Sequence, residues 1–186
     1  MKLIVGLGNP GKQYEKTRHN VGFMALNALR ERLSKECDMS EWQLSKKFNA
    51  DVCGGTLQGE KIILAKPMTF MNDSGQAVQL LTHFYSLTHR DLIVVHDEKD
   101  VPLGDIKVQT NRGAAGHNGV RSIMEHIGTQ DFTRVRIGIA SSNPKKMKDT
   151  PEFVLGKFGL FERKPLETGI TKAIQELLSL LSLKQR

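Results

Sequence analysis

The sequence predicts an α/β protein: a single domain with a twisted, mixed and largely parallel β-sheet flanked by helices. Two observations lead to this prediction. Short apolar runs alternate along the chain with longer segments in which apolar residues recur at helical spacing, which is the pattern of strand–helix–strand units. No repeat, low-complexity tract or shift in composition divides the 186 residues, so we expect residues 1–186 to form one domain.

The first half of the chain begins with a strand signal. Residues 2–7 contain a short apolar run that is typical of a buried strand. Residues 21–33 carry apolar side chains on one helical face and are expected to form a helix. Residues 48–57 and 60–66 predict two strands joined as a hairpin, because Gln58-Gly59 between them suits a tight turn.

The second half of the chain continues this alternation. In order, we expect a helix that starts near Asn72 or Ser74 and ends near residue 84, strands over residues 92–96 and 105–110, a helix over 118–127 and a strand over 134–140. A final helix begins near Pro165, where a proline is tolerated. Its apolar face, from Leu166 to Leu181, is expected to pack against the core.

Composition limits the classes of protein to consider. Lysine and arginine outnumber aspartate and glutamate by 27 to 20, a net charge of +7 that suits a nucleic-acid partner and equally a basic protein without one. Cys37 and Cys53 are too few for a disulfide framework and are expected to be reduced thiols. No apolar stretch approaches the ~20 residues of a membrane span and no signal peptide is evident, so we expect a cytoplasmic protein without membrane contact.

Residues 6–11, Gly-Leu-Gly-Asn-Pro-Gly, match the spacing G-x-G-x-x-G of a dinucleotide-binding fingerprint. A true fingerprint leads straight into a helix and has an acidic residue about 20 residues further on, at the end of the next strand. Here helical spacing starts only at Val21, and no acidic strand end appears near position 30. A nucleotide-binding oxidoreductase is therefore the weaker interpretation, and a functional strand-to-helix loop is the stronger one.

Polar side chains gather in the sequence where the predicted parallel strands end. In an open α/β sheet the ligand site lies beyond the carboxyl ends of these strands. We therefore expect three asparagines, a histidine and an aspartate to converge at one edge of the sheet. The candidates are Asn9, Tyr14 and His19 after the first strand, Phe70 and Asn72 after residues 60–66, Asp97 after residues 92–96, and Asn118 at the start of a helix.

This set of side chains suits a reaction in which water attacks a carbonyl group. A neutral histidine can take a proton from water near pH 7, and a carboxylate can orient its ring and stabilise the imidazolium that forms. Asparagine amides can hold the carbonyl or the developing oxyanion. The chain has no G-x-S-x-G motif and neither cysteine lies in such a loop, so direct attack by water is favoured over a covalent intermediate.

A metal site is the alternative interpretation for the segment His96-Asp97-Glu98 together with Asp100. The spacing of these residues matches none of the common zinc patterns, and the chain has no H-E-x-x-H sequence. We therefore expect a solvated acidic strand end, no metal and no cofactor.

Several short motifs together resemble one known family. They lie at residues 6–11, 17–20 (Thr-Arg-His-Asn), 69–72 (Thr-Phe-Met-Asn), 96–98 (His-Asp-Glu) and 116–119 (Gly-His-Asn-Gly), and residues 136–139 and 153–158 fit as well. In order and spacing these motifs closely resemble bacterial peptidyl-tRNA hydrolase over nearly the whole chain. The resemblance implies one peptidyl-tRNA hydrolase-like domain over residues 1–186.

The resemblance also implies an activity. It implies a monomeric, metal-independent esterase that cleaves the ester between peptide and tRNA in peptidyl-tRNA, recycling tRNA from ribosome drop-off products. His19 would be the general base that activates water, and Asp97 would orient it. The other implied roles are contact with the peptide carbonyl by Asn9, substrate positioning by Asn72 and Asn118, lining of the cleft near the tRNA end by Tyr14 and Phe70, and contact with a tRNA phosphate by Arg136.

Other roles for these residues remain open from the sequence alone. Asn72 and Asn118 could serve only as helix N-caps, and Tyr14 and Phe70 could be ordinary packing residues. A non-catalytic RNA-binding protein on the same scaffold is the competing function. The intact set of implied catalytic and positioning residues favours the enzyme without excluding that alternative.

The chain departs from the family pattern at three places. Residues 111–115 contain fewer glycines than the family loop, and Lys99 replaces a residue that is commonly apolar. Gln109 stands where the family has a phosphate-binding lysine, while Lys107 lies two residues earlier on the same strand face. Whether Lys107 or Gln109 contacts a phosphate stays open.

Overall fold

Seven strands form one β-sheet in the computed structural model of the chain, which describes residues 1–182. They lie in the order β2-β3-β4-β1-β5-β7-β6. The central strands β4, β1, β5 and β7 run parallel, whereas β2, β3 and β6 pair antiparallel with their neighbours at the two edges. The bounds are β1 Lys2–Gly6, β2 Gln43–Ser45, β3 Ala50–Leu57, β4 Glu60–Pro67, β5 Leu92–Pro102, β6 Ile106–Thr110 and β7 Thr133–Ala140.

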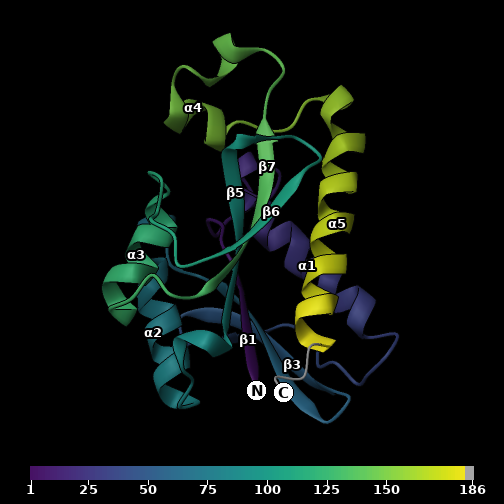
Figure 1. Ribbon diagram of the computed structural model, residues 1–186, viewed down its shortest axis with the longest axis vertical. Helices are drawn as coiled ribbons and strands as arrows, with labels where there is room; N and C mark the ends of the chain where they lie inside the picture. Colours follow the sequence, from purple (N-terminus) through teal and green to yellow (C-terminus); the bar gives the residue numbers. More distant parts are fainter. Residues whose placement is uncertain (183–186) are drawn as a thin grey trace.

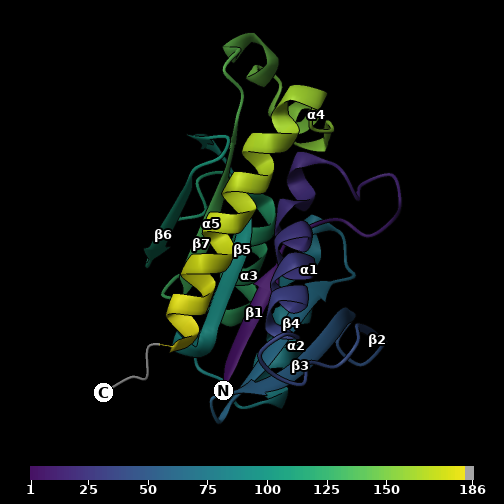
Figure 2. The same ribbon diagram turned by 90° about the vertical axis from the view of Figure 1, so that its right-hand side faces the viewer.

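Helices cover both faces of the sheet, as Figures 1 and 2 show. On one face lie α1 (Val21–Leu33) and α5 (Arg163–Ser182), and on the other lie α2 (Ser74–Phe84) and α3 (Asn118–Ile127). The short helix α4 (Thr150–Leu155) lies beyond the end of the sheet, at the top of Figure 1. The predicted α/β class, with a mixed and largely parallel sheet between helices, is therefore confirmed.

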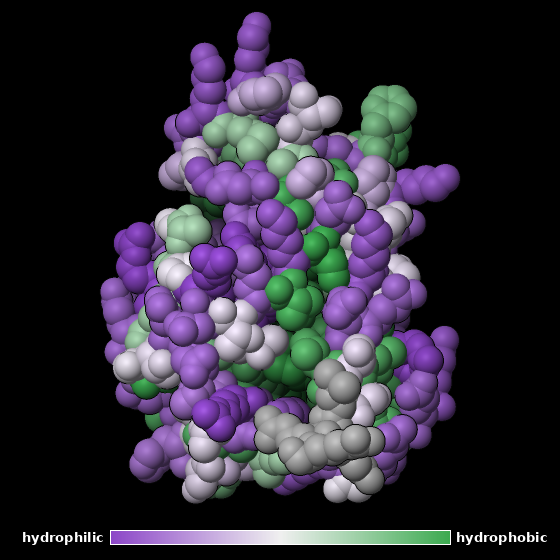
Figure 3. All heavy atoms as spheres, in the orientation of Figure 1, coloured by the Kyte–Doolittle hydropathy of each residue, from purple (hydrophilic) through white to green (hydrophobic). Residues whose placement is uncertain are grey.

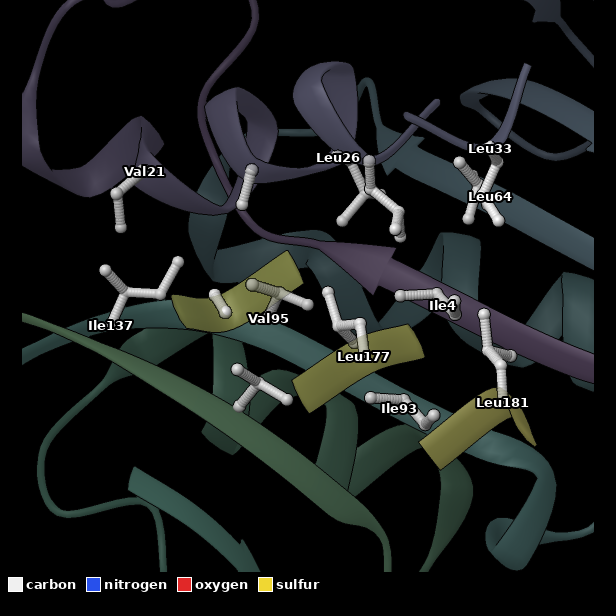
Figure 4. Packing of buried hydrophobic residues seen from close by; sticks show 14 of the residues in the cluster. Ile4, Val21, Leu26, Leu33, Leu64, Ile93, Val95, Ile137, Leu177 and Leu181 are labelled. Atoms are coloured by element: carbon white, nitrogen blue, oxygen red, sulfur yellow. The ribbon is translucent and has the colours of Figure 1, made fainter. Parts of the chain in front are cut away.

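Alternate residues of the central strands point to opposite faces and build two cores. Ile4 belongs to the core under α1 and α5, whereas Leu3 and Val5 belong to the core under α2 and α3. Figure 4 shows the first of these cores, where Leu26 of α1 and Leu177 of α5 pack among side chains of the sheet. The apolar run near the N-terminus is continuous because both faces of β1 are buried.

Two glycines let α1 approach the end of the sheet closely. A Cβ atom on Gly22 would lie 2.4 Å from the backbone oxygen of Val95, and one on Gly6 would lie 2.5 Å from that of Gly22. Any larger residue would push α1 away from β1 and β5. His19, three residues before Gly22, is thereby held against the carboxyl ends of these strands.

The polar segment His96-Asp97-Glu98 lies within a strand rather than after one. The predicted strand over residues 92–96 was too short, because β5 continues to Pro102 and pairs in parallel with β7 as far as Glu98 before the register shifts. The apolar run marks only the part of β5 that packs in the core. Beyond that part, backbone hydrogen bonds to β7 continue the strand through polar residues.

Two short elements of the structure, β2 and α4, were not predicted from the sequence. The start of α4 carried a recognisable signal, since the Asp149 side chain accepts a hydrogen bond from the Glu152 N–H and Pro151 lies in the first turn. Of the two starts considered for the second helix, Ser74 is right. Asn72 lies in a separate 3₁₀ turn, η2 (Met71–Asp73), just before it.

Within residues 1–182, no helix combines the length and the apolar composition that crossing a membrane would need.

Candidate active site

A cleft of about 680 Å³ opens at the carboxyl ends of the central strands. Its walls come from the loop between β1 and α1, from η2, from β5, from the loop before α3 and from α4. The cleft therefore lies beyond the carboxyl ends of the parallel strands, where the sequence predicted a ligand site. Seven of the eight predicted site residues line it: Asn9, Tyr14, His19, Phe70, Asn72, Asp97 and Asn118.

His19 and Asp97 form a hydrogen-bonded pair inside the cleft. His19 lies in a 3₁₀ turn just before α1, and its Nδ1 is 2.8 Å from Oδ1 of Asp97 on β5. The Asp97 side chain is only 3% exposed. A buried carboxylate accepts the Nδ1 proton, so the imidazole keeps its other nitrogen, Nε2, as the proton acceptor.

His117 contacts the same carboxylate oxygen, which the sequence analysis did not predict. Its Nε2 lies 2.9 Å from Oδ1 of Asp97, and its ring centroid lies 4.9 Å from that of His19. Nδ1 of His117 accepts a hydrogen bond from the Val120 N–H and caps α3, so Nε2 carries the proton that Asp97 accepts. The sequence could have indicated His117, because this histidine immediately precedes the predicted site residue Asn118.

The environment of Asp97 keeps it ionised. Burial acts to raise the pKa of Asp97, but the charges of His19 and His117 and the hydrogen bonds from both hold that pKa well below its usual value. His96, by contrast, is held in its neutral form. Its burial, reinforced by the neighbouring His117, lowers the pKa of His96 well below 6.5, and its Nδ1 donates to the Asp97 backbone oxygen at 2.7 Å. His96 is therefore a neutral supporting residue.

Side chains of the types that bind metal ions also meet in this cleft, but they are not the set of residues suggested by the sequence. Donor atoms of His19, Asp97 and His117 all lie within 4.8 Å of one another. His96 and Glu98, which suggested a metal site in the sequence, do not join this group, because they bond to backbone and to Arg136. The three donors form a His–Asp–His hydrogen-bond network, and the absence of a metal requirement stays a prediction that a chelator can test.

Asn9 presents the amino end of its carboxamide to the cleft. Its Oδ1 accepts a hydrogen bond from the Met71 N–H at 2.8 Å, which fixes the orientation of the amide. The Asn20 side chain bonds both backbone groups of Asn9, each at 2.9 Å, and holds the loop in place. Nδ2 of Asn9 is left as a pre-oriented donor for an acceptor in the cleft.

The structure decides the open alternatives for the other cleft residues. Neither Asn72 nor Asn118 caps a helix, because the N-cap positions of η2, α2 and α3 are held by Phe70, Asp73 and His117. Both asparagines are exposed at the cleft. Tyr14 and Phe70 meet edge to face at 6.4 Å and Phe70 is 58% exposed, so they form an open aromatic wall and not core packing.

Arg136 is the predicted site residue that does not line the cleft. Its guanidinium pairs with the buried Glu98 of β5, with Nε donating to Oε2 at 2.9 Å, and it also donates to Gln109. Lys107 faces Arg136 across the β6–β7 pair and is exposed. The positive charge of Arg136 is therefore paired with Glu98 inside the protein, while Lys107 is open to solvent.

The buried side chain of Arg18 connects the His19 turn to the segment after α4. Arg18 donates to the Lys157 backbone oxygen at 2.9 Å and pairs with Glu162 at 2.7 Å. Its guanidinium also stacks on Phe153, 4.5 Å from the ring centroid. These contacts tie the wall that α4 contributes to the turn that carries His19.

Comparisons with known proteins found a matching family model and similar sequences. Residues 3–186 match the family model described as peptidyl-tRNA hydrolase. The chain is 47% identical to the peptidyl-tRNA hydrolase of Mycobacterium leprae (strain Br4923) over 167 residues, covering 90% of this chain and 80% of the relative. It is 46% identical to that of Aquifex aeolicus (strain VF5), covering 96% of this chain and 88% of the relative.

A solved structure is similar in fold as well as in sequence. The crystal structure of peptidyl-tRNA hydrolase from Acinetobacter baumannii superposes with a TM-score of 0.86 and is 35% identical. The match covers 97% of this chain and 88% of that one.

Proposed function

The chain belongs to the peptidyl-tRNA hydrolase family, and from this premise we propose that it hydrolyses the ester linking the peptide to tRNA in peptidyl-tRNA. Such a hydrolase acts in translation by recycling tRNA from ribosome drop-off products. One observation supports this function most strongly: the buried His19–Asp97 pair lies in the same cleft as the pre-oriented amide of Asn9. We further propose that the protein works as a monomer in the cytoplasm.

In the proposed mechanism His19 is the general base. Nε2 of His19 takes a proton from a water molecule as the water oxygen attacks the ester carbonyl carbon. Asp97 keeps the Nδ1 proton on its side of the ring and stabilises the imidazolium that forms. When the carbon–oxygen bond to the ribose breaks, the imidazolium returns the proton to the ribose oxygen, which regenerates neutral His19.

The amide of Asn9 supplies the proposed stabilisation of the oxyanion. Nδ2 of Asn9 would donate to the carbonyl oxygen, on which negative charge develops during attack. Asn72 and Asn118 would position the acylated end of the substrate by hydrogen bonds. Tyr14 and Phe70 offer aromatic faces, which suits stacking with an unpaired base near the 3′ end of the tRNA.

Two further residues have proposed roles away from the reacting atoms. His117 would hold Asp97 in place through the second hydrogen bond to Oδ1. The exposed Lys107 would contact an RNA phosphate outside the cleft, next to Arg136, whose guanidinium stays paired with Glu98. Contacts of this kind add affinity and salt dependence rather than catalytic rate.

The test is hydrolysis of N-acetyl-aminoacyl-tRNA, compared with unblocked aminoacyl-tRNA, in the presence and absence of a chelator. We expect the protein to hydrolyse only the blocked substrate, with or without chelator. His19→Ala should lower kcat by about 10²–10⁴-fold, the usual contribution of a general base. The matched control is His83→Ala, an exposed histidine at the end of α2 outside the cleft, which should retain full activity.

Two outcomes would overturn this proposal in different ways. Loss of activity with chelator would indicate that the His19–Asp97–His117 cluster binds a metal ion needed for the reaction. A folded wild-type protein that binds tRNA but hydrolyses no ester would favour the non-catalytic RNA-binding function.

A further inference from the structure

Lys99 is the one lysine or arginine among the described residues that line the cleft. Two carboxylates line the cleft as well, but neither is available to it. Asp97 accepts hydrogen bonds from His19 and His117, and Glu98 pairs with Arg136. Within residues 1–182, no carboxylate forms an ion pair with the Lys99 ammonium, so this cation faces the cleft without a charged partner.

The Lys99 side chain reaches from β5 to the wall formed by α4. Its Nζ donates to Oγ1 of Thr150, the first residue of α4, at 3.4 Å. A lysine ammonium has three donors, and this single long contact leaves most of that capacity free. Lys99 is half-buried, which strengthens its attraction for an anion relative to a fully solvated lysine.

The position of Lys99 indicates which part of the substrate it meets. The sheet order places His19 and Asn9 of the β1 loop between the β4 side of the cleft and the β5–β7 side. Phe70 lies on the β4 side, whereas Lys99 and α4 lie on the β5–β7 side. With the base of the esterified nucleotide on the aromatic wall, its 5′ phosphate, which is attached to a different carbon of the ribose, would face the opposite side of the cleft, where Lys99 lies.

Other exposed cations lie on elements next to the β5–β7 side of the cleft. Lys145, Lys146 and Lys148 are exposed on the segment between β7 and α4, and Lys107 is exposed on β6. Figure 3 shows hydrophilic side chains projecting at the top of the molecule, where Figure 1 draws this segment. Several exposed cations on this side suit a polyanion such as RNA, and a phosphate of that chain is the anion that Lys99 would meet in the cleft.

We propose that Lys99 binds a phosphodiester oxygen next to the 3′-terminal nucleotide of the RNA while the ester lies at His19. Lys99 lies two residues beyond Asp97 on β5, and its ammonium reaches the α4 wall of the same cleft. The inference rests on the proposed function, and it names the group that the cleft uses to hold the nucleic-acid part of the substrate. Lys99 is thus a substrate-binding residue and takes no part in proton transfer.

The test uses three N-acetyl-aminoacyl esters that differ in their phosphates: an ester of adenosine, an ester of the dinucleotide CpA, and the full tRNA. Lys99→Met removes the charge and keeps the length of the side chain. We expect it to raise KM about tenfold for CpA and for tRNA, to leave kcat within about twofold, and to leave the adenosine ester unaffected. Lys99→Arg should restore the wild-type KM.

Salt dependence gives a second readout that a purely structural role would not change. For tRNA, the slope of log kcat/KM against log salt should become shallower by about 0.7 in Lys99→Met, as expected for one lost contact to single-stranded RNA. Lys35→Met is the matched control, because Lys35 is exposed beyond the end of α1, away from the cleft. It should leave KM and the slope unchanged.

Three outcomes would overturn the inference. An equal loss on all three esters would mean that Lys99 supports the cleft itself. A loss confined to substrates with aspartate or glutamate in the peptide would make a carboxylate the bound anion. Unchanged KM and slope would mean that Lys99 binds no anion.

Failure of the proposed function would be recognised separately. In that case wild-type protein would hydrolyse none of the three esters. Binding of unesterified CpA to the wild type and to Lys99→Met, followed by titration, would still test the phosphate contact.

Discussion

Two hollows in the described part of the chain are rich in histidine, and they differ in what the histidines face. The cleft at the carboxyl ends of the strands holds His19 and His117. A second hollow of about 540 Å³ is lined by residues of η3 (His89–Asp91) and of the C-terminal parts of α2 and α3, including His83 and His126. If only the number of lining histidines is considered, the second hollow suits acid–base chemistry as well as the first.

The carboxylates of the two hollows are in opposite environments. Asp97 is 3% exposed and accepts hydrogen bonds from two imidazoles. The carboxylate beside the second hollow is Asp131, which lies 3.2 Å from Nε2 of the lining residue His89, and its side chain is 45% exposed. Water screens an exposed pair, whereas a buried pair keeps a fixed geometry and a strong electrostatic effect on the ring. A histidine becomes a plausible general base where a buried carboxylate orients it, and the number of histidines is a poor guide.

The strongest test of this contrast replaces each carboxylate by its amide. Asp97→Asn should lower kcat by about 10³–10⁴-fold, because an amide can stabilise the wrong tautomer of His19 and does not support the imidazolium. Asp131→Asn makes the same chemical change beside His89 of the second hollow and should leave kcat unchanged. Steady-state hydrolysis of N-acetyl-aminoacyl-tRNA measures both, and similar losses in the two variants would remove the distinction between the hollows.

A smaller effect is expected from the amide donors of the two hollows. Asn9→Asp keeps the oxygen that accepts the Met71 N–H but removes the donor that faces the cleft, so kcat should fall by about 10²–10³-fold. Gln79→Glu is the counterpart, because Gln79 donates to the His126 backbone oxygen in the second hollow. It should alter stability slightly and kcat not at all. Full activity of Asn9→Asp would exclude Asn9 as the oxyanion donor.

The smallest effect concerns the pH dependence of stability and not the rate. Burial holds the pKa of His96 well below 6.5 in the folded protein, beside His117, Asp97 and Arg134. Below pH 6.5 the unfolded chain binds a proton at this position that the folded protein does not bind, so the free energy of unfolding falls as pH falls. His96→Asn keeps a donor near the Asp97 backbone oxygen and removes this titration.

The measurement is urea unfolding at several values between pH 8 and pH 5. The fall in the free energy of unfolding below pH 6.5 should be shallower in His96→Asn by about 1.4 kcal/mol per pH unit, the value for one proton. Above pH 6.5 the two stability curves should run parallel. Curves that stay parallel down to pH 5 would mean that His96 is protonated in the folded protein.

The sequence by itself determined the class of fold and the edge of the sheet at which the site lies. Periodicity is a local property, so apolar runs marked β1 and the buried part of β5, and helical spacing marked α1, α2, α3 and α5. Because parallel strands end at one edge, the polar residues that follow them could be brought together without coordinates. Seven of the eight predicted site residues do line one cleft.

Only the tertiary structure decided which side chains pair within that cleft. Asp97 is 78 residues from His19 and 20 from His117, and no pattern in the sequence shows that both rings reach the same oxygen. The same holds for Arg136, which forms an ion pair with Glu98, and for Lys99, which forms no ion pair within residues 1–182. Such pairings depend on strand register and on how closely α1 packs at Gly22, and these are settled by the packing of the whole molecule rather than by any single segment.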